Sequence, residues 1–137
     1  MSKLSQLSSL FLLMLSLILP GGVQAVDLET RTNREGAVTV KVTPKSISPG
    51  AKSWDFEITL STHSVPLNQD MARVSALVSD SGNPQSPLAW DGDPPGGHHR
   101  KGVLRFQPPS VMPQKLELQI NGIGGVNLRV FRWVLAK

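Results

Sequence analysis

The sequence predicts an all-β protein, a single antiparallel β-sandwich of about seven short strands with an immunoglobulin-like architecture. Apolar and polar residues alternate along most of the apolar segments, and this period of two is typical of half-buried strands. Turns rich in proline and glycine separate the segments, and the whole chain holds 11 Pro and 12 Gly. No stretch shows a sustained helical period. A small barrel is the alternative architecture.

The first 25 residues have the pattern of a cleavable secretory signal. Lys3 precedes an apolar run over residues 10–19, Pro20 follows the run, and Ala25 ends a short segment of small residues. A charged start, an apolar run of about 7–15 residues and a small-residue cleavage site are typical of such a signal. The run is shorter than the ~20 residues of a membrane-spanning helix. We therefore expect a periplasmic or secreted product with no stable membrane insertion after cleavage.

The remainder of the chain has the length of one domain. Residues 26–36 are polar and charged and predict a flexible or edge-lying lead-in, and residues 37–137 are expected to form the β-sandwich. The chain has no cysteine, so core packing and strand ladders must stabilise it without a disulfide, although an exported setting would permit one.

The first two strands have the clearest alternation. Residues 38–42 alternate valine with polar residues, and Pro44 is expected to end this strand before a turn at residues 46–50. The next strand has an apolar face that should form the centre of the core, composed of Trp54, Phe56, Ile58 and Leu60.

Later apolar segments are shorter, and turns bound each of them. Loops are expected over residues 62–71 and 91–99, and a turn at residues 121–125. The segments themselves are residues 74–78, 87–90, 103–106, 116–120 and 128–135. Trp54 and Trp133 fit alternating strand positions and are expected in the core, and the core is also favoured for Trp90.

The segment with the densest chemistry is residues 90–100, which read WDGDPPGGHHR. Loops on a rigid sheet are where binding residues concentrate. We therefore take Trp90, Asp91, Asp93 and Arg100 as candidates for binding a ligand or a partner. The alternative is a rigid connection in which the acids and Arg100 pair or hydrogen-bond to the backbone.

All three histidines lie in predicted loops, and they define a candidate metal site. Imidazole binds copper and zinc, and Asp93 would add an oxygen to His63, His98 and His99. Adjacent side chains point to opposite faces of an extended chain, so His98 and His99 can share an ion only if the glycines before them turn the loop. Copper or zinc is thus the one cofactor that the sequence suggests; otherwise none is expected.

Charge and motifs argue against several other functions. The 14 Lys and Arg residues are spread along the chain, and Arg100 and Lys101 are the only adjacent basic pair, so no nucleic-acid surface is expected. There is no cysteine nucleophile and no serine in a G-x-S-x-G motif. The acid pair Asp91 and Asp93 leaves a small hydrolase or carbohydrate-active fragment as a third hypothesis. We expect no catalytic residue and a non-enzymatic protein.

The run over residues 88–106, LAWDGDPPGGHHRKGVLRF, resembles a family of short, uncharacterised bacterial exported domains. Residues 62–64 (THS) and 130–133 (VFRW) are similar to the same family. The resemblance covers most of the chain after the signal and implies a bacterial envelope setting. It implies no activity and assigns no catalytic residue.

Two functions from different classes therefore follow from the sequence. The first is an envelope domain that binds another envelope protein or a small ligand through its loops. The alternative is a periplasmic copper- or zinc-binding domain that uses the loop histidines.

Overall fold

A computed structural model describes residues 28–135, which form nine strands and one short helix. The predicted signal, residues 1–25, lies outside the described residues. One sheet has the order β1-β2-β3-β7-β6 and the other β5-β4-β8-β9, and every strand pairing is antiparallel. The bounds of the first sheet are β1 Arg31–Asn33, β2 Val38–Lys45, β3 Trp54–Thr62, β7 His99–Phe106 and β6 Ala89–Gly92. Those of the second are β5 Pro84–Gln85, β4 Ser75–Val78, β8 Lys115–Ile123 and β9 Val126–Val134.

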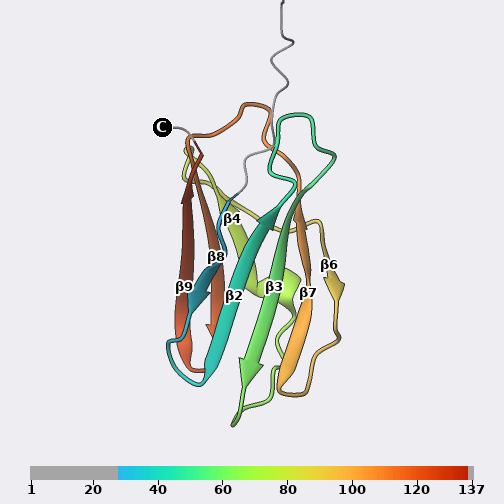
Figure 1. Cartoon of the computed structure of the whole chain (residues 1–137), viewed down its shortest axis with the longest axis vertical. Helices are drawn as coiled ribbons and strands as arrows, with labels where there is room; N and C mark the ends of the chain where they lie inside the picture. Colours follow the sequence, from blue (N-terminus) through green and yellow to red (C-terminus); the bar gives the residue numbers. More distant parts are fainter. Residues whose placement is uncertain (1–27, 136–137) are drawn as a thin grey trace, which may run out of the picture.

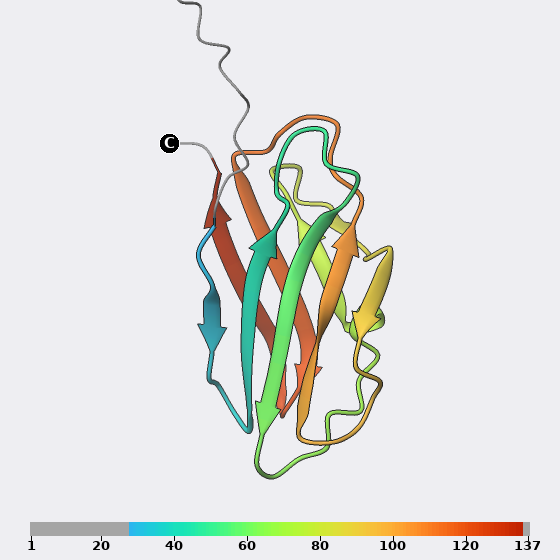
Figure 2. The ribbon, with the colours of Figure 1, turned by 45° about the vertical axis from the view of Figure 1, so that its right-hand side comes forward.

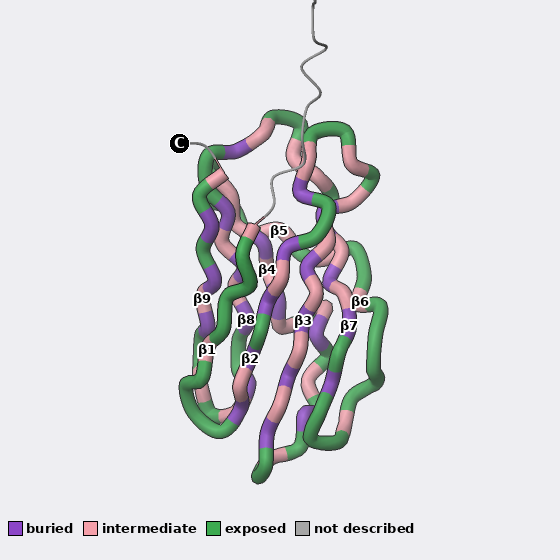
Figure 3. The backbone as a smooth tube through the Cα atoms, in the orientation of Figure 1, coloured by how far each residue is buried: buried purple, intermediate pink, exposed green. Residues whose placement is uncertain are grey.

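The two sheets lie face to face and share one core (Figure 1; Figure 2). Buried residues alternate with half-buried or exposed ones along β2, β3 and most of β8, as the period of two predicts (Figure 3). The Phe56 ring in β3 meets Phe106 edge-on at 5.6 Å between centroids and lies 5.8 Å from Trp133 of the opposite sheet. Phe56 therefore joins the two sheets. The prediction that Trp54 and Trp133 lie in the core is confirmed.

Strand β2 continues through Pro44, so the prediction that this proline ends the strand was wrong. Thr62 N donates to His98 O, and alternation along the ladder then directs the amide side of Val40, Val42 and Pro44 towards β1. The first residue of β1, Arg31, pairs with Val42. Pro44 therefore lies beyond the end of β1, where its missing N–H removes no ladder hydrogen bond.

Two predicted boundaries were also wrong. Strand β7 begins at His99, whereas the sequence predicted a loop there and a strand from Val103. Strand β8 runs to Ile123, beyond the predicted start of the turn at Asn121. The pattern failed in β7 because two of its inward positions hold Arg100 and Gly102 rather than apolar residues.

A one-turn helix, α1 (Met71–Val74), connects the first sheet to β4. The side chain of Asp70 accepts from Ala72 N at 3.1 Å and caps the helix start. Met71 is fully buried, so this turn anchors the preceding loop to the core. Among the described residues, no helix has the length and apolarity needed to cross a membrane.

The loops divide between the two ends of the molecule. The described chain begins and ends at one end, near the C label in Figure 1. The opposite end carries residues 63–70, between β3 and α1, and residues 93–98, between β6 and β7. We call these two loops together the tip. They contain His63 and His98, and His99 begins β7 beside them.

Candidate functional site

The tip is formed by two loops that are hydrogen-bonded to each other through their backbones. Thr62 N donates to His98 O at 3.0 Å. Leu67 N donates to Gly97 O at 3.1 Å, and Gly96 N donates to Leu67 O at 2.8 Å. The loop that carries His63 and the loop that carries His98 are thereby brought together, although the two histidines are 35 residues apart in the sequence.

Arg100 joins the two loops from the inside of the protein. It lies at an inward-facing position of β7 and is only 1% exposed. One guanidinium nitrogen, Nη1, donates to Leu67 O at 3.1 Å and Gln69 O at 2.7 Å. The other, Nη2, donates to Asp93 O at 3.2 Å. A single side chain therefore binds carbonyl groups from both loops of the tip.

Among the described residues, no carboxylate is in direct contact with the Arg100 guanidinium. Burial lowers the pKa of the guanidinium, while Asp93 and Asp70 act at longer range in the opposite direction. The Trp90 ring lies 5.6 Å from the guanidinium carbon, within range of a cation–π interaction. Arg100 Nε–H is buried and has no hydrogen-bond partner within residues 28–135. Arg100, which we took as a possible ligand-binding residue, thus bonds to the backbone of the tip.

Trp90 lies against a flat patch made by two glycines. Gly92 and Gly102 face each other across the β6–β7 pair. A Cβ at Gly102 would come within 2.6 Å of Trp90 Cζ2 and 2.7 Å of the Gly92 Cα. The indole Nε1 donates to Asp93 O at 2.9 Å. Trp90 is half-buried and packs against the edge of the core, with one edge tied to the 93–98 loop.

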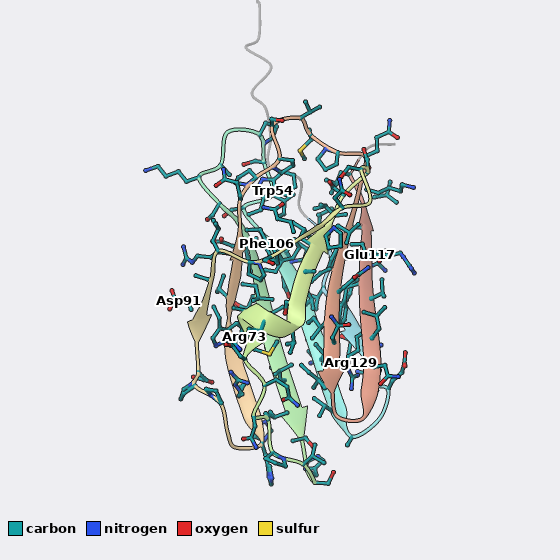
Figure 4. The ribbon with its side chains drawn as sticks, turned by 180° about the vertical axis from the view of Figure 1, so that it is seen from behind. Trp54, Arg73, Asp91, Phe106, Glu117 and Arg129 are labelled. Carbon is teal, nitrogen blue, oxygen red and sulfur yellow. The ribbon has the colours of Figure 1, made fainter. Side chains whose placement is uncertain are left out.

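The two candidate acids have different surroundings. Asp93 closes the turn into β7, since its Oδ2 accepts from Lys101 N at 2.8 Å and its N donates to Lys101 O at 3.0 Å. Asp91 lies on the outer side of β6, away from the core (Figure 4), where its Oδ2 is 3.4 Å from Arg105 Nη2. The side chains therefore take part in separate interactions, Asp93 with the backbone and Asp91 with an exposed cation.

The structure places the four candidate metal ligands at the same end without assembling them around a point. His63, His98 and His99 are all exposed. Within residues 28–135, no group of three or more His, Asp or Glu side chains is arranged to hold a metal ion. The copper or zinc site remains a prediction, with the adjacency of the His63 and His98 loops as its structural basis.

A second buried arginine was not singled out from the sequence. Arg129 of β9 faces inward, where Nη2 donates to Ile123 O at 2.9 Å and Nη1 donates to Asn33 Oδ1 (Figure 4). Burial lowers its pKa. The sequence pattern could have indicated this burial, because in the alternation of β9 Arg129 shares the inward face with Phe131 and Trp133. Arg129 ties the turn between β8 and β9 to β1, much as Arg100 ties the tip.

A hollow of about 230 Å³ lies away from the tip, on the outer side of the second sheet. Its lining includes two acids whose pKa values are lowered. Hydrogen bonds from the backbone N–H groups of Gln114 (2.9 Å) and Lys115 (3.0 Å) lower the pKa of Asp80. A hydrogen bond from the Gln119 side chain (2.8 Å), and then the ion pair with Arg132 (2.9 Å), lower the pKa of Glu117.

We expect acid to destabilise the protein partly through Asp80 and Glu117. As the pH falls, the unfolded chain takes up these protons before the folded protein does, because the folded pKa values are the lower ones. The stabilisation is complete above about pH 5 and is lost as the pH falls through the lowered values. The free energy of unfolding in urea, measured at about pH 6 and about pH 3, tests this expectation. The drop in that free energy between the two pH values should be smaller in the Asp80→Asn/Glu117→Gln variant, and an unchanged drop would contradict this account.

The fold and the site together define a class: an all-β domain of two antiparallel sheets, with two loops at one end cross-braced by a buried arginine. No protein-family model matches the chain, and no curated protein or solved structure matches it. The functional inference therefore depends on the geometry of the tip.

Proposed function

We propose that this protein is an exported domain of the bacterial envelope, with an immunoglobulin-like β-sandwich fold, that binds a partner protein through its tip and performs no catalysis. The observation that carries this proposal is the bracing of the tip by Arg100, by two backbone hydrogen bonds between its loops and by a third from Thr62 at the end of β3 to His98. A loop pair held in one arrangement loses little conformational entropy when it binds. The braced tip is therefore suited to recognising the surface of another macromolecule.

The strand order supports the immunoglobulin-like assignment. In that fold, strands A, B, E and D form one sheet, and C, F and G form the other, with C′ beside C in some members. The orders β2-β3-β7-β6 and β5-β4-β8-β9 correspond to A-B-E-D and C′-C-F-G. Strand β1 is an addition at the edge of the first sheet. In immunoglobulin-like domains the loops at the ends of the sheets carry recognition, which fits the role proposed for the tip.

The position of the tip also supports partner binding. Its exposed side chains include His63 and His98, and the exposed prolines Pro94 and Pro95 lie beside them. The tip lies at the end opposite the one at which the described chain begins and ends (Figure 1).

Site-specific photo-crosslinking in the source cell tests the proposal. A benzophenone amino acid at His98 is expected to give a discrete protein adduct, and the same amino acid at His63 should give the same adduct. Lys52 is the matched control, because it is exposed in the turn between β2 and β3 at the opposite end. Adducts of equal yield from Lys52, or none from either tip position, would contradict binding through the tip.

Export is a separate part of the proposal with its own test. Processing after Ala25 should give a product that begins at Val26, and intact-mass measurement of the protein from the envelope or medium detects it. Ala25→Trp places a large residue where small ones are required and should leave the precursor uncut. Gln24→Ala changes the neighbouring position, which the peptidase does not read, and should be processed normally. Retention of the whole chain by the unaltered protein would refute the export proposal.

A copper- or zinc-binding function is the second candidate, and the Thr62–His98 hydrogen bond favours it because it brings two histidine-bearing loops together. This candidate predicts stoichiometric binding of Cu²⁺ or Zn²⁺ by calorimetry, weakened at least about tenfold in the His98→Ala/His99→Ala variant. Asp91→Asn is the control, since Asp91 lies on the outer side of β6. Weak binding of equal strength in all three proteins would eliminate the metal function and leave partner binding.

A further inference from the structure

In the part of the chain that the structure describes, the two sheets have four edge strands, and only one of these is long. Strand β1 has 3 residues, β6 has 4, and β5 has 2 and includes Pro84. Strand β9 has 9 residues and no proline. Proteins prevent unwanted strand pairing with short edge strands and prolines, so a long edge that lacks these features is suited to pairing with another strand.

The hydrogen-bonding groups on this edge can be assigned from the ladder. Leu135 N donates to Gln114 O at 2.7 Å, on the β8 side. Hydrogen-bonding direction alternates along an antiparallel strand, so Arg129, Phe131 and Trp133 also direct their backbone groups to β8. The groups of the alternate residues point to the open edge: Leu128, Val130, Arg132 and Val134.

Within residues 28–135, no other strand pairs with this open edge. Strand β1 lies beside β9, but two hydrogen bonds that join this region of the chain to β9 come from inward-facing side chains of β9. Trp133 Nε1 donates to Glu29 O at 2.8 Å, and Arg129 donates to Asn33 Oδ1. β1 thus closes the side of the core and leaves the backbone of the β9 edge unpaired.

The outward side chains along this edge are mainly apolar. Leu128 is 45% exposed and Val134 is 66% exposed, with half-buried Val130 between them. The one charge, Arg132, is paired with Glu117 of the same chain at 2.9 Å. The edge therefore presents free amide and carbonyl groups beside an apolar strip that carries no net charge.

We propose that β9 pairs in antiparallel fashion with β9 of a second copy of this chain, which joins the two second sheets into one. A two-fold axis near Phe131 places Leu128 opposite Val134 of the second copy and Val130 opposite Arg132 of the second copy. All four residues belong to the set with free backbone groups, so every pair in this register can exchange hydrogen bonds. The exposed apolar ends of the two strips cover each other.

A second copy suits the edge better than an unrelated strand because the edge is complementary to itself. A two-fold contact repeats the same patch on both sides, so each half must complement its own image. The apolar ends satisfy this requirement, and the Glu117–Arg132 pair prevents two uncompensated arginines from meeting at the centre. An interface built on one strand pair is small, so we expect a dissociation constant of roughly 10–500 µM.

The test uses protein purified from cells that express the full chain. Sedimentation velocity from about 5 µM to about 1 mM should show monomers converting to dimers. Hydrogen exchange at the two concentrations supplies the specific signature. The amides of Val130 and Arg132 should gain protection about two- to ninefold at high concentration, as the fraction of monomer falls, whereas those of Phe131 and Trp133 are bonded to β8 and should be protected at both.

Two variants disrupt the pairing in different ways. Val130→Pro removes an edge-facing donor without removing a bond to β8, and Val134→Lys places a charge on the apolar strip. Either should weaken dimerisation at least about tenfold while the far-ultraviolet circular dichroism and melting profile stay those of the folded protein. Val111→Lys is the matched control, because Val111 is 78% exposed in the loop before β8. Monomers throughout the range, or dimers that both edge variants leave unchanged, would overturn the proposal.

Discussion

Replacement of Arg100 by alanine is expected to lower the free energy of unfolding by about 3–5 kcal/mol, because it removes a buried, hydrogen-bonded charge from the base of the tip. The carbonyls of Leu67, Gln69 and Asp93 would lose their donor, and the side chain would leave a cavity beside Trp90. Urea unfolding of the purified protein measures the change. In the Arg100→Ala variant, hydrogen exchange should also show that residues 63–70 open more readily than the strands do.

Two substitutions distinguish this account from general sensitivity of β7. Lys101→Ala alters the next residue, whose side chain is exposed, and should change the free energy of unfolding by less than about 0.5 kcal/mol. Arg100→Lys keeps the positive charge but lacks the planar fork that reaches three carbonyls, so its effect should lie between those of the other two variants. Equal stability of Arg100→Ala and Lys101→Ala would show that Arg100 does not brace the tip.

Gly102→Ala is expected to lower the free energy of unfolding by about 2–3 kcal/mol, because the added methyl group has no room. It would meet Trp90 Cζ2 at 2.6 Å and the Gly92 Cα at 2.7 Å. The ring must leave its place or β6 must separate from β7, and the second response requires movement of backbone. Urea unfolding gives the energy, and the indole N–H signal of Trp90 in a nitrogen-15 spectrum reports whether its bond to Asp93 O is lost.

Val103→Ala is the control for Gly102→Ala, since this neighbouring β7 residue is only half-buried and faces outward. It should cost less than about 1 kcal/mol and leave the Trp90 signal in place. If Gly102→Ala were as stable as the unaltered protein, with the same Trp90 signal, the packing of Trp90 on the two glycines would be refuted. Arg100→Ala and Gly102→Ala also test the proposed function. Both should weaken crosslinking at the tip, although neither alters an exposed tip side chain.

The tip and the β9 edge make separable predictions. The tip lies at the end opposite the described termini, whereas the β9 edge runs along the side of the second sheet (Figure 1; Figure 4). A dimer formed through β9 would therefore leave both tips exposed and present two copies of the proposed binding surface. Val130→Pro should weaken the dimer and keep the adducts formed at His98, whereas Arg100→Ala should weaken the adducts and keep the dimer.

The alternation of apolar and polar residues was enough to predict an all-β fold and most of the core. In β3 the alternation of Trp54, Phe56, Ile58 and Leu60 with polar residues is a local property of the chain, and the structure buries all four side chains. A strand of this kind buries its apolar face against any apolar surface, whichever segment provides it. Its existence and orientation therefore follow from the period of two. The sequence likewise indicated residues 90–100 as a distinctive segment.

The roles of those residues depend on contacts that form only in the folded protein. Arg100 interrupts the apolar pattern of β7, and its burial depends on carbonyl groups of residues 67 and 69, which no local pattern brings near it. A glycine is required at position 102 because the Trp90 ring and the Gly92 backbone of β6 lie too close for a side chain. The exposure of the β9 edge depends on which strands pair with it. Alternation reports how one strand faces a core, whereas hydrogen-bond partners, braced loops and open edges depend on contacts between distant segments. Such contacts exist only once the two sheets have assembled.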